Sequence, residues 1–144
     1  MKQILINLSN TINSDLHLKI VSKEITITEN KSDAICKKVN FKSTTNNIFA
    51  FSLDYDMSNR CKIFPYFNQS TVGINKVNDG IIFYIKNSEI YVLIIELKST
   101  NLSDYKKQLQ AGKIFVLYLL EILNNSFSKK YILKLTFITP INLK

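Results

Sequence analysis

The sequence contains few of the residues on which disulfide-rich, zinc-binding and histidine-dependent hydrolytic proteins rely. Its 144 residues include two cysteines, one histidine, three glycines, two prolines and no tryptophan. Cys36 and Cys61 are too few for a disulfide framework, and neither has a histidine or cysteine nearby at metal-ligand spacing. His17 has no partner histidine, so mechanisms of the Ser/His/Asp, Cys/His and zinc-protease types lack their usual base or ligand. Any catalysis must therefore use carboxylates and lysines.

Long hydrophobic runs are missing as well. Lysine, glutamate or asparagine interrupts every apolar stretch before it reaches the roughly 18 residues that a membrane-spanning helix needs. The N-terminal stretch is interrupted by Asn7 and has no small-residue cleavage site of the kind that ends a signal peptide. We therefore expect a cytoplasmic protein with no membrane partner. A chain of 144 residues has the size of one domain, and with 46% hydrophobic residues it can bury a sizeable core, so we also expect one core and a single domain over residues 1–144.

The charge is strongly of one sign. The chain has 19 basic and 11 acidic residues, which gives a net charge of +8. Such a balance favours a polyanionic partner, such as nucleic acid, or an acidic membrane surface. Nearly all of the positive charge is lysine, however, with Arg60 the only arginine, and an A/T-rich genome would also enrich lysine, asparagine and isoleucine. Charge alone therefore leaves open whether the protein binds nucleic acid.

The first half of the chain carries weak signals of local structure. Apolar residues alternate with polar ones over residues 16–28, which predicts a β-hairpin. Residues 32–39 are compatible with a short helix, and residues 48–54 are typical of a buried strand. Residues 57–78, which contain Pro65 and Gly73, predict mostly loop and are also compatible with one short strand.

The signal sharpens at the start of the second half. Residues 80–85 and 90–97 form two apolar runs rich in β-branched and aromatic residues, and a polar tetrapeptide at 86–89 separates them. This pattern predicts a central antiparallel hairpin. Because both runs are apolar on both faces, we expect the sheet to be covered on both sides.

A helix should follow this hairpin, beginning near Asn101 or Ser103 and ending near Asn124. Its apolar stripe recurs at steps of three and four residues and consists of Tyr105, Leu109, Gly112, Val116, Leu119 and Leu123. Residues 131–139 predict a further strand. The order from residue 48 is thus strand, strand, strand, helix, strand, which indicates an α/β fold.

Three charged residues stand at the ends of the predicted hairpin. Asp79 precedes its first strand, and Glu96 and Lys98 lie at the end of its second strand. Reversal of the chain at residues 86–89 places Asp79 opposite Glu96, and residues two apart in a strand point to the same face. Two neighbouring carboxylates repel each other unless a cation lies between them, and Mg²⁺ prefers such oxygen ligands. The lysine could orient or deprotonate a water, or stabilise developing negative charge.

These features resemble the PD-(D/E)xK nuclease superfamily over residues 48–139. The resemblance depends on Asn78-Asp79-Gly80, on Glu96-Leu97-Lys98-Ser99, and on a glutamine in Gln108-Leu109-Gln110-Ala111-Gly112. It implies a restriction-endonuclease-like core, in which a central mixed β-sheet is flanked by helices. It also implies that Asp79 and Glu96 bind Mg²⁺ or Mn²⁺, that Lys98 is the catalytic lysine, and that Gln108 is an orienting residue.

The chain departs from the superfamily pattern in two places. Asn78 replaces the proline for which the motif is named. The first core helix, which often supplies another acidic residue, cannot be located from the sequence. Five acids remain candidates for that role: Glu24, Glu29, Asp33, Asp54 and Asp56.

The resemblance predicts a metal-dependent nuclease that hydrolyses phosphodiester bonds in nucleic acid, with DNA favoured over RNA, and restriction, defence or repair as candidate roles. Lys106 and Lys107, at the start of the predicted helix, are candidate phosphate contacts. Because the chain is small, sequence specificity would require a homodimer or a partner subunit. One alternative is an inactive nuclease-fold subunit that binds nucleic acid or a protein, and another is an unrelated basic α/β protein.

Overall fold

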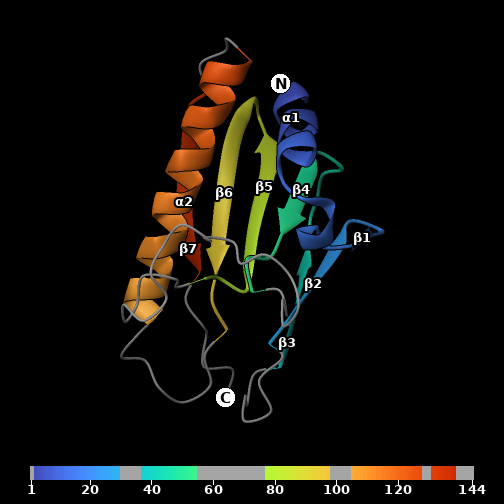
Figure 1. The fold of residues 1–144 in the computed structure, drawn as a ribbon. Helices are drawn as coiled ribbons and strands as arrows, with labels where there is room; N and C mark the ends of the chain where they lie inside the picture. Colours follow the sequence, from blue (N-terminus) through green and yellow to red (C-terminus); the bar gives the residue numbers. More distant parts are fainter. Residues whose placement is uncertain (1, 30–36, 55–76, 98–104, 128–130, 139–144) are drawn as a thin grey trace.

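The computed structural model describes residues 2–29, 37–54, 77–97, 105–127 and 131–138. In chain order the elements are α1 (Gln3–Thr11), the 3₁₀-helix η1 (Ser14–Leu16), β1 (Ile20–Val21), β2 (Glu24–Thr28), β3 (Lys38–Lys42), β4 (Ile48–Phe51), β5 (Gly80–Lys86), β6 (Glu89–Ile95), α2 (Tyr105–Ser126) and β7 (Leu133–Ile138). The described residues form a mixed α/β fold with two α-helices and two β-sheets (Figure 1). No helix in these ranges is sufficiently long and apolar to cross a membrane.

The larger sheet has the strand order β4-β5-β6-β7. Neighbours are antiparallel from β4 to β6, whereas β6 and β7 are parallel. Two consecutive parallel strands need a crossover connection, and α2 provides it. The predicted order of strand, strand, strand, helix and strand from residue 48 is therefore confirmed.

The hairpin β5–β6 forms the centre of this sheet. Asn87 and Ser88 form its turn with φ angles of 49° and 63°. Positive φ at both central residues matches the twist of a two-residue hairpin turn and fixes the register. The residue pairs run from Lys86 opposite Glu89, next to the turn, to Gly80 opposite Ile95, at the far end of the hairpin. The two strands are therefore paired over their whole length.

The two faces of the larger sheet are covered differently. On one face, Phe51, Phe83 and Val92 pack against α1 and α2 in a single apolar cluster. On the other face, the small sheet β1-β2-β3 places Ile25 and Ile27 against the sheet. The expected covering of both faces is confirmed. Both α-helices of the described residues lie on the same face, and the small sheet covers the other.

Helix α2 buries the apolar stripe that its sequence predicts. The buried members are Leu109, Gly112, Val116, Leu119 and Leu123. Residues at steps of three and four share one side of an α-helix, so this side contacts the sheet. The opposite side of the helix carries three exposed apolar residues, Ile114, Leu117 and Tyr118.

The N-terminal third agrees only in part with the sequence analysis. β1 and β2 form the hairpin expected within residues 16–28, with Ser22 and Lys23 at positive φ between them. The helix predicted over residues 32–39 is wrong at its C-terminal end, because Lys38 and Val39 begin β3, which pairs with β2. Residues 30–36 lie outside the described ranges. Helix α1 is the first helix of the fold, and no pattern in the sequence predicted it.

A glycine allows the two sheets to approach each other. A Cβ atom at Gly80 would lie 2.6 Å from Ile27 Cδ1, so no larger residue fits without displacing Ile27. Gly80 is the first residue of β5, and Ile27 lies near the C-terminal end of β2. This close approach brings the end of β2 to the start of β5, where Asp79 lies.

Candidate functional site

Two carboxylates meet at the open end of the hairpin β5–β6. Asp79 directly precedes β5 and Glu96 directly follows β6, and the pairing of Gly80 with Ile95 aligns them. Both side chains are buried, with exposed fractions of 4% and 1%. The Leu97 N–H donates a hydrogen bond to Asp79 Oδ2, which joins the two chain segments. The register expected from the sequence thus brings Asp79 beside Glu96.

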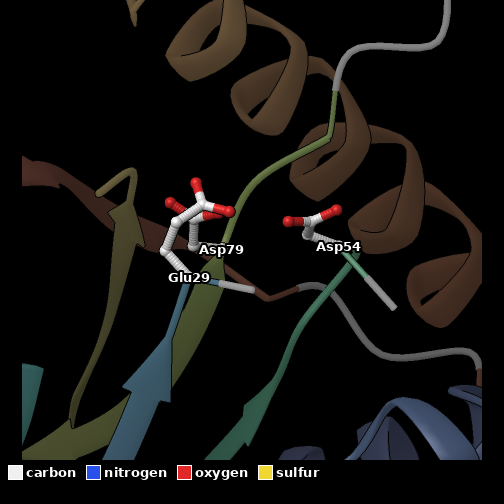
Figure 2. A group of neighbouring side chains, drawn as sticks. All are labelled: Glu29, Asp54 and Asp79. Carbon is white, nitrogen blue, oxygen red and sulfur yellow. The ribbon is translucent and has the colours of Figure 1, made fainter. Parts of the chain in front are cut away.

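Two of the five candidate upstream acids join Asp79. Glu29 directly follows β2, and Asp54 lies shortly after β4. One carboxylate oxygen from each of Glu29, Asp54 and Asp79 lies within 4.8 Å of the other two. Figure 2 shows the three side chains gathered at one end of the sheet. Glu29 is buried and Asp54 is half-buried, so this is not a cluster of freely solvated charges.

Backbone hydrogen bonds hold Asp54 and Glu29 in place. The N–H groups of Leu53 and Asp54 both donate to the Asn78 carbonyl oxygen, each over 3.2 Å. The Asp54 N–H also lies 3.1 Å from Ser52 Oγ. The Glu29 N–H donates to the Lys37 carbonyl oxygen over 3.0 Å, next to the start of β3. Each acid is therefore held by a hydrogen bond to the residue segment next to the strand that pairs with its own: Asp54 by the segment before β5, and Glu29 by the segment before β3.

The electrostatics of the site show that its carboxylates oppose one another. The pKa of Asp79 is raised from 3.8 to about 7. Burial is the largest cause, followed by the negative charge of Glu96, and Glu29 and Asp54 add smaller increments. The hydrogen bond from the Leu97 N–H acts in the opposite direction and favours the ionised form. At neutral pH the site therefore favours uptake of a proton or of a cation.

Gln108 and Asn78 lie beside the carboxylates. Gln108 is buried in the first turns of α2, whereas Gln110 is exposed. Asn78 Nδ2 donates to the Gln108 carbonyl oxygen over 3.1 Å and to Glu96 Oε2 over 3.5 Å. Gln108 Oε1 is buried and accepts no hydrogen bond from the described residues. In the sequence Asn78 stands out only as a departure from a motif, and no local pattern predicts these contacts.

Some of the other residues named from the sequence lie outside the described residues, and the rest are not among the clustered carboxylates. Lys98, Asp33 and Asp56 lie outside the described residues. Glu24 begins β2 and is thus at the opposite end of that strand from Glu29. Lys106 and Lys107 are exposed near the start of α2. They lie in the same helical turn as Gln108, and hence on the side of the molecule where the carboxylates gather.

The donor atoms of the cluster determine which metals it suits. Glu29, Asp54, Asp79 and their neighbour Glu96 offer only carboxylate oxygens. Mg²⁺ and Mn²⁺ prefer oxygen ligands, whereas zinc in structural sites prefers thiolate and imidazole ligands. The raised pKa of Asp79 fits the same conclusion, because a cation would relieve the repulsion that opposes its ionisation. The residues present therefore fit a hard divalent cation.

Comparisons of this chain with protein-family models, with curated proteins and with solved structures found no match. Its function must therefore be inferred from the site itself. Fold alone would not suffice for this purpose, because unrelated activities occur on the same architecture.

Proposed function

We propose that this protein is a metal-dependent nuclease with a restriction-endonuclease-like core, which hydrolyses phosphodiester bonds in nucleic acid, with DNA favoured over RNA. The observation that carries the proposal is the group of carboxylates at one end of the sheet, in which Asp79 has Glu96, Glu29 and Asp54 as neighbours. Burying several like charges together costs free energy unless protons or a cation compensate them. A site for Mg²⁺ or Mn²⁺ explains why the fold retains this arrangement.

The topology supports the fold part of the proposal. The order α1, β4, β5, β6, α2, β7 follows the helix, three strands, helix, strand pattern of the superfamily that the sequence resembles. Asp79 opens one central strand and Glu96 ends the next, as the superfamily motif requires. The sheet β1-β2-β3, inserted between α1 and β4, is an addition to that pattern, and it contributes Glu29.

Each site residue has a role in this proposal. Asp79 and Glu96 hold the metal, and Glu29 and Asp54 are placed to complete its ligands. A bound Mg²⁺ or Mn²⁺ would neutralise charge on the scissile phosphate and promote ionisation of the attacking water. Lys98, two residues after Glu96, is proposed to orient that water or to stabilise the negative charge that develops on the phosphate.

Binding of the polyanion would depend on residues around this cluster. The net charge of +8 favours association with nucleic acid. Lys106 and Lys107 are exposed in the helical turn that contains Gln108, and we propose that they contact phosphates beside the scissile bond. We propose Gln108 as an orienting residue, because its side chain is buried and its main-chain carbonyl oxygen accepts a hydrogen bond from the same Asn78 amide that contacts Glu96.

Cleavage of plasmid DNA tests the proposal. We expect the purified protein to nick supercoiled plasmid in Mg²⁺ or Mn²⁺ at low salt, and to be inactive in EDTA. Asp79→Asn should abolish nicking, whereas Glu24→Gln, which changes an acid at the far end of β2, should cleave like wild type.

Absence of cleavage with plasmid, single-stranded DNA and RNA, in a protein that is folded, would contradict the proposed activity. If such a protein still bound Mn²⁺ and nucleic acid, the better account would be an inactive nuclease-fold subunit. If it bound neither, an unrelated role for this α/β protein would be favoured.

A further inference from the structure

Asn78 lies at the junction of the segments that carry the site. Its side chain is fully buried, and it directly precedes Asp79. Its carbonyl oxygen accepts hydrogen bonds from the N–H groups of Leu53 and Asp54, both over 3.2 Å. The main chain of one residue thus connects the start of β5 to the segment that follows β4. Asp54 and Asp79 are held together by this connection.

The side-chain amide of Asn78 makes a second connection. Its nitrogen carries two N–H groups, which donate to Glu96 Oε2 over 3.5 Å and to the Gln108 carbonyl oxygen over 3.1 Å. The reverse amide orientation would place the Asn78 oxygen against two acceptors, so the hydrogen-bond pattern selects the orientation present here. One amide therefore joins the carboxylate after β6 to the first turns of α2.

Gly112 makes room for this amide. A Cβ atom at position 112 would clash with Asn78 Oδ1 and would lie 2.9 Å from Asn78 Cγ and 2.8 Å from Ile94 Cγ2. Asn78 Oδ1 is buried and accepts no hydrogen bond from the described residues. A buried carbonyl without a partner costs free energy, and an apolar residue of similar size would avoid that cost. Packing alone does not explain an asparagine at this position.

We infer that Asn78 is a positioning residue, whose amide fixes the Glu96 carboxylate and the start of α2 in the geometry that binds the metal. The inference rests on the proposed function, because it explains the contacts of the Asn78 amide by their effect on a metal site. Partners that orient a metal ligand contribute strongly to affinity although they do not touch the metal. The first readout is therefore metal binding rather than cleavage.

Calorimetric titration with Mn²⁺ tests the inference. Asn78→Ala should weaken Mn²⁺ binding by about 10- to 100-fold, the range typical of such orienting partners. Asn78→Ser, which is less disruptive but too short to reach both acceptors, should weaken it in the same direction and serves if Asn78→Ala does not fold. Asn7→Ala is the matched control, because Asn7 is a buried asparagine that contacts Gln3 and Tyr131 instead. It should lower stability and leave the Mn²⁺ affinity unchanged.

A double-mutant cycle without metal tests whether the Asn78 amide packs against Gly112 as the structure shows. Gly112→Ala should destabilise the wild type, because its methyl group meets the Asn78 amide. Gly112→Ala should destabilise the Asn78→Ala variant less. Its effects on the folding equilibrium constant in the two backgrounds, measured by urea denaturation, should differ by about 3- to 100-fold. Additive effects of the two substitutions would overturn the inference.

The outcomes separate the inference from the proposed function. Unchanged Mn²⁺ affinity in the folded Asn78 variants, with measurable binding by the wild type, would overturn the inference alone and leave Asn78 with a structural role. Absence of Mn²⁺ binding by the wild type would overturn the proposed function, and the inference with it. Weaker binding in both Asn78 variants, with normal binding in Asn7→Ala and a coupled cycle, would support the inference.

Discussion

Replacement of Asp79 by asparagine should change the way in which stability depends on pH. The substitution keeps the size of the side chain and an oxygen that can accept the hydrogen bond from the Leu97 N–H. It removes the group that Glu96, Glu29 and Asp54 repel. The variant should therefore fold, and at neutral pH it should be more stable than the wild type.

The size of this change in stability follows from the difference between the pKa of Asp79 in the unfolded chain and in the folded protein. In the unfolded chain this carboxyl should titrate near 3.8, whereas in the folded protein its pKa is about 7. Between these values the folded protein holds a proton that the unfolded chain releases, so stability falls as pH rises through this window. Because one pKa unit corresponds to about 1.4 kcal/mol, the loss by pH 8 approaches about 4 kcal/mol.

Urea denaturation at pH 4 to 8 in EDTA measures this loss. The free energy of unfolding of the wild type should fall with pH relative to that of Asp79→Asn, with the difference concentrated between pH 4 and 7. Glu121→Gln, which changes an exposed carboxylate on α2, should follow the wild type. Parallel pH profiles for wild type and Asp79→Asn would refute the reasoning, because they would show that Asp79 ionises as freely in the folded protein as in the unfolded chain.

Three further predictions test the surroundings of the site. Glu29→Gln should weaken Mn²⁺ binding in calorimetry and Glu24→Gln should not, because only Glu29 lies with Asp79; equal effects would remove Glu29 from the site. Gly80→Ala should lower the free energy of unfolding by about 1–3 kcal/mol, because its Cβ meets Ile27 Cδ1; unchanged stability in thermal or urea unfolding would mean that Ile27 moves aside. The affinity for DNA, measured by fluorescence anisotropy, should fall steeply with salt concentration, and a lack of binding at low ionic strength would show that the net charge does not serve nucleic-acid binding.

The central part of the fold could be predicted because its signals are local. The strands β5 and β6 are long apolar runs around a polar turn, and α2 has a regular apolar stripe. Once the turn at residues 86–89 is placed, the register follows, and it aligns Asp79 with Glu96. This half of the candidate site was accessible from the sequence for that reason.

Helix α1 could not be predicted because its local signals are weak. It has nine residues, no side-chain cap at its N-terminus, no acidic residue in its first turn and no basic residue in its last turn. Its stability comes from burial of Ile4 and Leu8 against the sheet, which depends on residues far along the chain. Tertiary packing decides its structure.

The choice among the five upstream acids was also beyond the sequence. Glu29 reaches Asp79 only because the small sheet packs on the larger one through Ile25, Ile27 and Gly80. β3 alternates between half-buried and exposed residues and was not recognised as a strand, so this sheet could not be assembled beforehand. The placement of Glu29 is therefore a result of contacts between distant segments.

The most direct test of the proposed activity compares Glu96→Gln with Lys98→Met. Mn²⁺ affinity would be measured by calorimetry and nicking of plasmid DNA by gel electrophoresis, for both variants and the wild type. Glu96→Gln should lose metal binding and cleavage together, because a ligand charge is removed. Lys98→Met should keep or strengthen metal binding, because a neighbouring positive charge is removed, yet it should lose most of the cleavage activity. Cleavage by Lys98→Met at the wild-type rate would contradict the proposed active site.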